Sequence, residues 1–505
     1  MMKLNGLVAG ALATGLVFGL IASANAAEIT TSDYAEALPL AVKFFGAQRS
    51  GDNHNWLLAR NPAGSTCHLG DGEAYASGYD LTGGWMDAGD FLKFTQNNAF
   101  TAHSLLKAYE VWPDAFADLD DIAYSGVPNG IPDILDEVKI ATDYLLKVMP
   151  DDDTVIARVG GNQDHDNLYT CPTMSALPAE QGGDPRPVYA DGKANTAGIA
   201  AAALALMSKL YMPYDADYAA AALAQAKRLD AFAKAHPGTV ADGYYPEGVC
   251  ETPEGEDVTY DEDYYENGRC AANWTDGEYR DAEMCGAIEL YRATGETTYF
   301  DRASALSAEL DDHGWVVGWG QNEDYCRHSL ALAGDEAAIA LLKTANDRAI
   351  DLVSDSPNVK GLAYYMPWGS LNSALSAAFS AALTFELTGE EKYRDFAVSQ
   401  VDYALGQNEY DRSFIVGWGH NPPQHPHHAN TLGVDDGDWE KFSNETPMAY
   451  ELTGAMVGGP TEEAEDVTKA GYEDDIADYI GNEVTIYYNS ALVGALAFAA
   501  SSSAP

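Results

Sequence analysis

Two aspartates stand three residues apart in GGWMDAGDFLKF, the stretch that runs from residue 83 to residue 94. Small residues separate Asp87 from Asp90, and the aromatic side chains of Trp85 and Phe91 flank the pair. Carboxylates placed so close together could hold a water molecule and remove its proton, which is the work of a general base. The same spacing is also typical of a solvated turn, so a partner elsewhere in the chain has to indicate catalysis.

Two later stretches contain residue types that are common in active sites. SFIVGWGHNPPQHPHHAN (413–430) is rich in histidines, which could form a structural loop or bind a transition metal adventitiously. YEDDIADYIGNEVTIYYNSALVGALA (472–497) places Glu483 directly before an apolar run. A glutamate at the start of a helix is also favoured by the helix dipole, so its position alone does not indicate chemistry.

Most of the chain has the apolar periodicity of helices, which would have to position these residues. In the stretch 131–149 apolar residues recur every three or four positions, and Pro132 and Asp133 stand where a helix begins. Similar patterns, several of them closed by glycine, occupy 195–211, 218–236, 281–295, 371–389 and 393–406. They predict roughly ten to twelve helices, and the weak strand patterns disfavour a βαβ fold. Aromatic and acidic residues gather in the intervening loops, where a rigid scaffold carries a site.

The charge of the chain excludes several classes of partner. Lysine and arginine number 28 against 78 aspartates and glutamates, which gives a formal net charge of −50. Such a surface repels nucleic acids and anionic membranes, so we expect neither as a partner. A salty habitat would suit this balance, because salt screens the repulsion between like charges.

The N-terminal segment predicts export. Residues 1–26 combine Lys3, an apolar run and the small residues ANA before Ala27, which indicates a cleaved signal peptide; a membrane anchor is the alternative. No linker divides residues 27–505, so we expect one domain. Six cysteines allow 15 pairings, among which Cys250–Cys270 is favoured because it closes a short acidic loop. The absence of a CxxC pair disfavours a zinc–thiolate site.

Taken together, the three stretches resemble glycoside hydrolase family 9, a family of cellulases and related β-glucanases. The third stretch has the spacing of the family's C-terminal pattern at Tyr472, Asp474, Tyr479, Glu483 and Asn489. The first two match its GGW-x-DAGD and S-F-V-V-G-x-G-x-N-P-P…H-H motifs, and weaker similarities follow in order from about residue 35 to 499. The resemblance implies an all-α fold, an (α/α)6 barrel with a cleft formed by loops at one end, which agrees with the independent helix count.

The resemblance also implies an inverting glycosidase, in which two carboxyl groups act on opposite sides of the sugar ring. By position Glu483 is the general acid, Asp90 the general base, and Asp87 a second acceptor for the attacking water. Asp474, which would orient active-site loops or tune the acid, and His427, which would bind sugar hydroxyls near the cleavage point, complete the catalytic set. The implied substrate-binding residues are His165, Tyr169, Trp368, Tyr488 and Trp85, of which Trp85 would wall the cleft or pack beneath it.

Four departures from the family affect substrate and ion contacts. Ala429 stands where the family usually has arginine after two histidines, and Asn372 stands at another usual arginine position. Leu168 and Tyr169 follow a histidine where tryptophan is usual. Loss of a guanidinium group predicts weaker binding at one sugar site or a preference for shorter or modified chains, and Ala429→Arg is expected to lower KM. No cofactor is expected to be required, and a structural calcium ion stays an option although one ligand is lost in Asp281-Ala282.

These observations predict a secreted, monomeric β-1,4-glucanase acting on β-glucan or its oligosaccharides, with endo cleavage favoured. One alternative is an exo-acting glycosidase on cello- or glucosamine oligosaccharides, since an acidic cleft would suit a cationic sugar. The other is a sugar-binding protein without catalysis, which the retention of Asp87, Asp90 and Glu483 disfavours.

Overall fold

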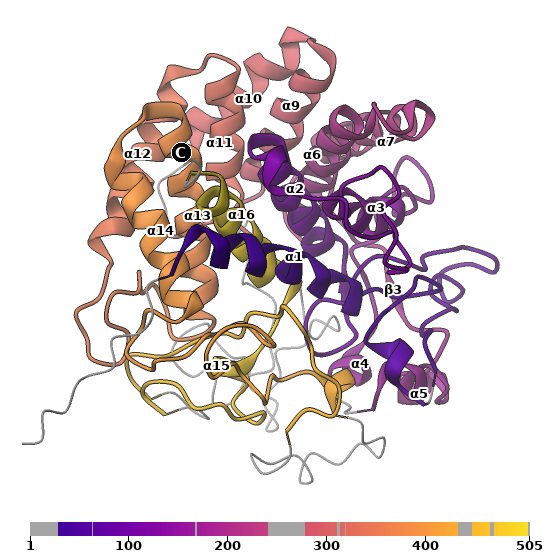
Figure 1. Ribbon diagram of the computed structural model, residues 1–505. Coiled ribbons are helices and arrows are strands. Elements are labelled where there is room, and N and C mark those ends of the chain that lie inside the picture. Colours follow the sequence, from indigo (N-terminus) through magenta and orange to yellow (C-terminus); the bar gives the residue numbers. More distant parts are fainter. Residues whose placement is uncertain are drawn as a thin grey trace, which may run out of the picture.

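The computed structural model describes residues 29–62, 64–166, 169–240, 278–310, 314–318, 320–432, 447–464 and 469–502. Six helices of this part form a closed ring in which each helix packs against the next and the last packs against the first (Figure 1). In ring order they are α2 (Thr95–Val111), α6 (Ala194–Tyr211), α9 (Arg280–Thr294), α11 (Glu323–Leu332), α13 (Ser370–Thr388) and α16 (Ile486–Ser502).

Six further helices in the described ranges surround that ring, one against each inner helix. They are α1 (Thr31–Ala47), α3 (Asp133–Leu145), α7 (Ala216–Ala235), α10 (Thr297–Glu309), α12 (Glu336–Asp351) and α14 (Glu391–Leu405). α1 covers α16, α3 covers α2, and each of the other four covers the inner helix that precedes it in the chain. This double ring is the predicted (α/α)6 barrel. The sequence periodicity located six of its helices to within a few residues, namely α3, α6, α7, α9, α13 and α14.

The two layers differ in composition because they differ in burial. The inner helix α6 is rich in alanine and buries nearly every residue, whereas the outer helix α10 buries only Ala303 and Ser307. Small side chains let inner helices approach closely. A Cβ atom added at Gly198 of α6 would lie 2.5 Å from the backbone carbonyl carbon of Ala282 in α9, so that crossing requires glycine.

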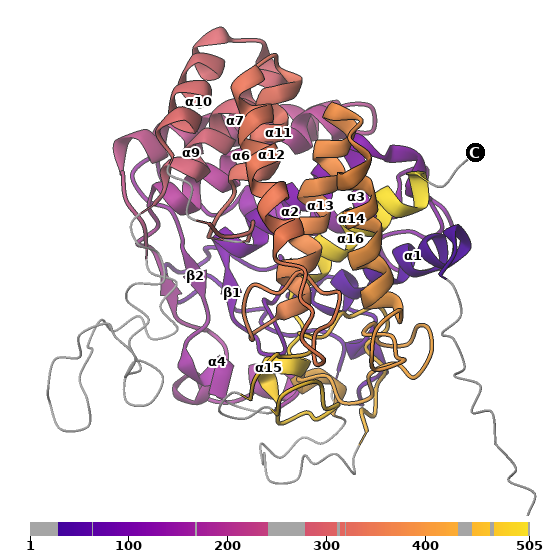
Figure 2. The same cartoon turned by 90° about the vertical axis from the view of Figure 1, so that its left-hand side faces the viewer.

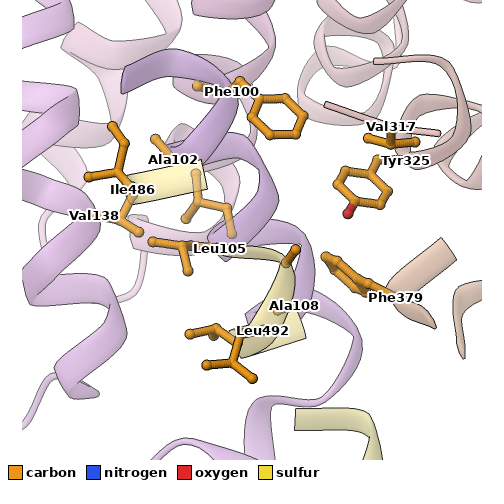
Figure 3. Packing of buried hydrophobic residues seen from close by; sticks show 14 of the residues in the cluster. Phe100, Ala102, Leu105, Ala108, Val138, Val317, Tyr325, Phe379, Ile486 and Leu492 are labelled. Atoms are coloured by element: carbon orange, nitrogen blue, oxygen red, sulfur yellow. The ribbon is translucent and has the colours of Figure 1, made fainter. Parts of the chain in front are cut away.

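Aromatic side chains from different inner helices meet within the core (Figure 3). Phe100 of α2 stacks on Tyr325 of α11 with 6.2 Å between ring centroids, and Tyr325 lies 4.6 Å from Phe379 of α13. Leu492 of α16 is also buried in this cluster, which includes side chains from Tyr34 near one end of the chain to Ala499 near the other. The centre of the barrel is therefore a packed core that fixes the inner helices relative to one another.

Loops and short elements gather at one end of the barrel (Figures 1 and 2). They include α4 (Asn162–Asp166), α5 (Cys171–Ser175), α15 (Tyr479–Asn482) and an antiparallel sheet of β1 (Lys93–Phe94), β2 (Arg158–Val159) and β3 (Val188–Tyr189), in the order β1-β2-β3. Four 3-10 turns, Leu58–Arg60, Pro113–Ala115, Ala179–Gln181 and Ala429–Thr431, lie in connecting segments.

Two disulfides join described cysteines, Cys67 to Cys171 and Cys285 to Cys326. The favoured pair Cys250–Cys270 and the predicted signal peptide lie outside the described residues. Among the helices of the described ranges, none combines the length and the apolar character that crossing a membrane requires.

Candidate active site

Backbone hydrogen bonds join the three conspicuous stretches of the sequence into one site. The amide of His427 donates to the carbonyl oxygen of Asn482 at 2.8 Å, and the amide of Ala429 donates to that of Gly89 at 2.9 Å. The amide of Ile486 in turn donates to the carbonyl oxygen of Asp87 at 2.9 Å. The first segment, more than 300 residues before the other two in the sequence, therefore lies beside both of them at the loop end of the barrel.

The approach of two of these segments depends on a glycine. A Cβ atom at position 89 would lie 2.1 Å from the carbonyl oxygen of His427, far inside van der Waals contact. Gly89 separates Asp87 from Asp90, so the small residue between the two aspartates lets the histidine loop pack directly against them. The spacing DAGD thus has a steric reason in addition to a chemical one.

Glu483 lies between two helices and is oriented by the start of the second. Its backbone is extended, with φ −58° and ψ 145°, directly after α15 and before α16. Thr485 caps α16, because its hydroxyl oxygen accepts a hydrogen bond from the amide of Tyr488 at 3.0 Å. Glu483 therefore precedes the helix instead of belonging to its first turn, and the cap places Tyr488 close to it.

The carboxyl group of Glu483 is held through one oxygen. The indole Nε1–H of Trp368 donates to Oε2 at 2.7 Å, and the hydroxyl of Tyr488 donates to the same oxygen at 3.0 Å. Burial raises the pKa of Glu483 to about 7, the two donors act in the opposite direction, and the negative charge of Asp90 adds to the increase. A carboxyl group with this pKa carries its proton in a large share of molecules at neutral pH, as a general acid must.

Asp90 faces the same space and is held by a histidine. His165 Nδ1 lies 2.7 Å from Asp90 Oδ2, and the amide of Leu92 donates to Oδ1 at 3.3 Å. The influence of Asp90 and His165 on the pKa of Glu483 places both within electrostatic range of that carboxyl group. His165, predicted to bind sugar, thus contacts the candidate base itself.

Asp87 is anchored by the first turn of α2. The side-chain amide of Asn97 donates to its Oδ1 atom, and the backbone amide of Asp87 donates to the carbonyl oxygen of Leu92 at 2.8 Å. The charges of Asp87 and Glu483 both raise the pKa of the buried Tyr487 hydroxyl, although burial is the larger cause. Asp87, Asp90 and Glu483 therefore share one electrostatic environment.

The two neighbouring histidines have different partners. His427 Nδ1 lies 2.6 Å from the carbonyl oxygen of Ile476, so this nitrogen carries the proton and Nε2 is the acceptor. Burial lowers the pKa of His427, which keeps the ring neutral. His428 Nε2 donates to Gln48 Oε1 at 2.7 Å, and Gln48 Nε2 donates to the carbonyl oxygen of Ala88 at 2.6 Å. His428 thus ties its loop to the aspartate loop, and the metal alternative has no support from these contacts.

Asp474 holds the loop that leads to His427. Its carboxylate accepts hydrogen bonds from the amides of Gln424 and His425 at 2.8 and 3.0 Å, and from Arg412 Nη2 at 3.3 Å. Gln424 and His425 lead directly to His427. The first of the two predicted roles, orientation of an active-site loop, agrees with these contacts, because both oxygens already have partners.

Two of the predicted substrate-binding residues are buried away from any ligand. Trp85 has 0% exposure and packs on Phe45 with 5.1 Å between ring centroids, so it lies beneath the site and cannot stack on a sugar. Tyr488 is 2% exposed, and its hydroxyl contacts Glu483 instead of solvent. Trp85 thus takes the second of its two predicted places, beneath the cleft, and Tyr488 lies beside the acid as expected. A motif gives no information on which side of the chain faces the core, so the sequence could not decide between contact with sugar and packing.

The other two aromatic residues keep partly exposed side chains. Trp368 lies 5.2 Å from Tyr479 between ring centroids and donates to Glu483, so it positions the acid whether or not it also stacks on sugar. Tyr169 packs at the edge of a small apolar cluster that contains the Cys67–Cys171 disulfide. Leu168, its neighbour, lies outside the described residues.

The position of the missing arginine is buried. Ala429 is 3% exposed and belongs to the same small apolar cluster, together with Met86, Phe91 and Ile476. An arginine grafted here would place its charged chain among these apolar groups, which changes the expectation that Ala429→Arg improves binding. At Asn372, the second departure, the buried side-chain oxygen has no hydrogen-bond partner.

The residues at the family's calcium position do not fit a calcium ion. Ala282 has no oxygen in its side chain, and Asp281 Oδ2 already accepts two hydrogen bonds from Asn322, at 2.9 and 2.8 Å. Two groups of described residues come close enough to share a metal, but one contains the disulfide sulfurs of Cys67 and Cys171. The other contains Asp71, which Arg186 and Lys93 already neutralise.

Several residues that organise the site carried no recognisable signal in the sequence. Asn97 follows the paired aspartates closely enough to have been suspected, since amides commonly orient carboxylates. Gln48, Arg412 and Arg186 contact the site only through the fold, from distant parts of the chain. Covariation between aligned relatives is the signal that could have found them.

Comparisons with known proteins agree with this geometry. The model of glycosyl hydrolase family 9 matches residues 34–496. Endoglucanase A of Bacillus pumilus is 32% identical over 93% of the chain, which spans 66% of that relative, and endoglucanase 13 of Arabidopsis thaliana is 28% identical over 96% of the chain and 97% of its own length. A solved endoglucanase from the termite Nasutitermes takasagoensis superposes with a TM-score of 0.74 at 30% identity, covering 93% of this chain and 99% of that one. Cellulase Cel9M of C. cellulolyticum, solved with cellobiose, gives 0.73 at 26% identity, covering 93% and 98%.

Proposed function

Because the chain belongs to glycosyl hydrolase family 9, we propose that it is an inverting endo-β-1,4-glucanase acting on cellulose or related β-glucans. The observation that carries this proposal is the state of Glu483, whose pKa burial raises to about 7 in a site that it shares with Asp90. A carboxylic acid that keeps its proton at neutral pH, close to a second carboxyl group, is the arrangement that glycosidic cleavage requires. The endoglucanase names of the relatives support the substrate class.

In the proposed reaction Glu483 donates its proton to the glycosidic oxygen as the bond to the leaving sugar breaks. A water molecule held between Asp87 and Asp90 attacks the anomeric carbon from the opposite face, and Asp90 takes its proton. Trp368 and Tyr488 bind Oε2 of Glu483, so Oε1 is the oxygen left to carry the transferred proton. His427 offers Nε2 as an acceptor for a sugar hydroxyl, because its Nδ1 proton is directed to Ile476.

The decisive experiment is hydrolysis of cellohexaose followed by proton NMR, together with the viscosity of carboxymethylcellulose. The proposal expects products that first appear as the α-anomer and a rapid loss of viscosity. Release of the β-anomer would contradict inversion, and slow loss of viscosity with steady release of reducing sugar would indicate exo action. Binding without hydrolysis would indicate a sugar-binding protein.

Matched variants test the assignment of the acid. Glu483→Gln should abolish cleavage while leaving oligosaccharide binding in place, because the amide cannot donate the acid proton. Glu409→Gln is the control, since Glu409 is an exposed glutamate that likewise accepts a hydrogen bond from a tyrosine, Tyr403 of the outer helix α14, at 3.2 Å. It should retain full activity, and cleavage by Glu483→Gln would overturn the assignment.

We also propose that residues 27–505 act as one catalytic domain, as a monomer outside the cytoplasm and without a calcium requirement. The Cys67–Cys171 and Cys285–Cys326 disulfides support an oxidising location. The hydrogen bonds from Asn322 to Asp281 support calcium independence, because they occupy the carboxylate that would bind the ion. Size-exclusion chromatography of the secreted protein tests the oligomeric state.

A further inference from the structure

Four charged side chains are buried directly behind the candidate base. This cluster, hereafter the buried charge cluster, consists of Asp71, Lys93, Asp164 and Arg186, each no more than 1% exposed. Arg186 binds Asp71 in bidentate fashion, through Nε at 2.9 Å and Nη2 at 2.8 Å, and Lys93 Nζ donates to Asp71 at 2.8 Å. The two negative and two positive side chains give the cluster a net charge of zero, so no buried charge is left unpaired.

The remaining nitrogen of Arg186 reaches the two segments that carry the base and its histidine. Nη1 donates to Asp164 Oδ1 at 3.0 Å and to the carbonyl oxygen of Phe91. Asp164 immediately precedes His165, and Phe91 immediately follows Asp90. The amide of Phe91 also donates to the carbonyl oxygen of Asp164 at 3.3 Å, so both segments are tied at a single point.

This connection has a direct consequence for the contact between His165 and Asp90. Their side chains meet at 2.7 Å, from two segments that are otherwise loops and one short helix, α4. A displacement of either segment by about 1 Å would alter the orientation of the Asp90 carboxylate toward water, and errors of that size cost roughly a hundredfold in rate. A buried ion cluster is a weak source of stability, since apolar groups of equal volume often stabilise a fold as well.

We propose that Arg186 is a positioning residue for the hydrolytic reaction, holding His165 against Asp90 through Asp164 and the backbone of Phe91. It acts at a distance, because its guanidinium group is completely buried and contacts neither water nor substrate. The inference rests on the proposed role of Asp90 as the base. On this proposal the buried charge cluster serves catalysis, by fixing the positions of His165 and Asp90, as well as stabilising the fold.

Arg186→Lys and Asp164→Asn test the proposal. Lysine keeps the positive charge but cannot bind Asp71, Asp164 and the Phe91 carbonyl together. Asparagine keeps the volume of Asp164 but removes its negative charge, which weakens the bond from Arg186 to the segment that carries His165. For both folded variants we expect kcat on cellohexaose to fall about 10- to 100-fold while KM changes less than about twofold, because the loss affects the transition state. The alkaline limb of the pH profile, which reports Glu483, should stay in place.

Arg292→Lys is the matched control. Arg292 pairs with Glu110 at 2.7 Å and Glu289 at 3.0 Å in a second buried ion cluster. Glu110 lies 15 residues beyond Thr95 along α2, about 22 Å from the loop end of the barrel. This variant should lose stability without losing kcat.

Three outcomes would overturn the proposal. The first is a folded Arg186→Lys or Asp164→Asn variant with unchanged kcat, and the second is a change in KM alone. The third is that neither variant folds while Arg292→Lys does, since the cluster would then serve stability only. Failure of the proposed function is recognised separately, because the parent protein would then not cleave cellohexaose at all.

Discussion

The buried acid predicts that Glu483→Gln makes the protein more stable at alkaline pH while destroying its activity. Burial raises the pKa of Glu483 from 4.5 to about 7, so the folded protein holds this proton more tightly than the unfolded chain does. The stability contributed by the neutral form is complete below pH 4.5 and is lost as the pH rises through about 7. A difference of about 2.5 pH units corresponds to about 3 kcal/mol, which is the upper limit of the loss.

Glutamine has the shape of the neutral acid and never ionises, so the variant avoids this loss. The measurement is the free energy of unfolding by urea at pH 4 and at pH 9, for the protein and the variant. We expect the variant to gain up to about 3 kcal/mol relative to the parent between these pH values. All other titrating groups are shared and cancel in the difference.

An exposed glutamate gives the matched control for this prediction. Glu36→Gln makes the same chemical change at an exposed position of α1, so it measures the effect of the substitution itself. If the difference between Glu483→Gln and the parent were constant with pH, the carboxyl group would titrate normally in the folded protein. The argument that burial keeps the acid protonated would then fail.

Three further predictions concern the neighbourhood of the acid, the missing arginine and the ions. Tyr488→Phe removes a donor that favours the ionised form of Glu483, so the alkaline limb of the pH profile of kcat/KM should move upward by about one pH unit. The control is Tyr403→Phe, which loses a similar contact to Glu409 and should leave this limb unchanged. A downward movement of the limb in Tyr488→Phe would contradict the geometry. Ala429→Arg should lower Tm without lowering KM, because the arginine side chain enters an apolar cluster. A lower KM in a protein of unchanged Tm would show instead that the arginine reaches the substrate. With a net charge of −50, Tm should rise between 0.05 and 1 M NaCl and stay unchanged when EDTA is added; a Tm that does not respond to salt, or that falls with chelator, would refute the respective part.

The barrel was predictable because its signal is repeated along the chain. Each helix carries an apolar periodicity of its own, and the alanine-rich stretch at 194–211 indicated a helix packed on several sides. The contact between α16 and α2, which closes the ring, could be predicted only from the family resemblance, because no local pattern specifies which helices become neighbours.

The candidate site was predictable in its residues but not in its contacts. The family resemblance assigned chemistry to Asp87, Asp90 and Glu483, whereas which side chains reach the cleft and which enter the core depended on packing. Trp85 and Tyr488 illustrate the limit, because an aromatic residue beside an acid can face either way. The motif marked Asp474 as part of the site but left its role open between orienting a loop and tuning the acid. Its hydrogen bonds to the amides of Gln424 and His425 agree with the first role.

The interleaving of the three segments by backbone hydrogen bonds also makes activity a reporter of folding. Acid and base lie almost 400 residues apart in the sequence, and they meet only when the last inner helix docks beside the first. Contacts of such long range form late in folding, because the loop between them must first be ordered. A partly folded chain would therefore have no hydrolytic activity, and the appearance of activity during refolding would report that the ring of inner helices has closed.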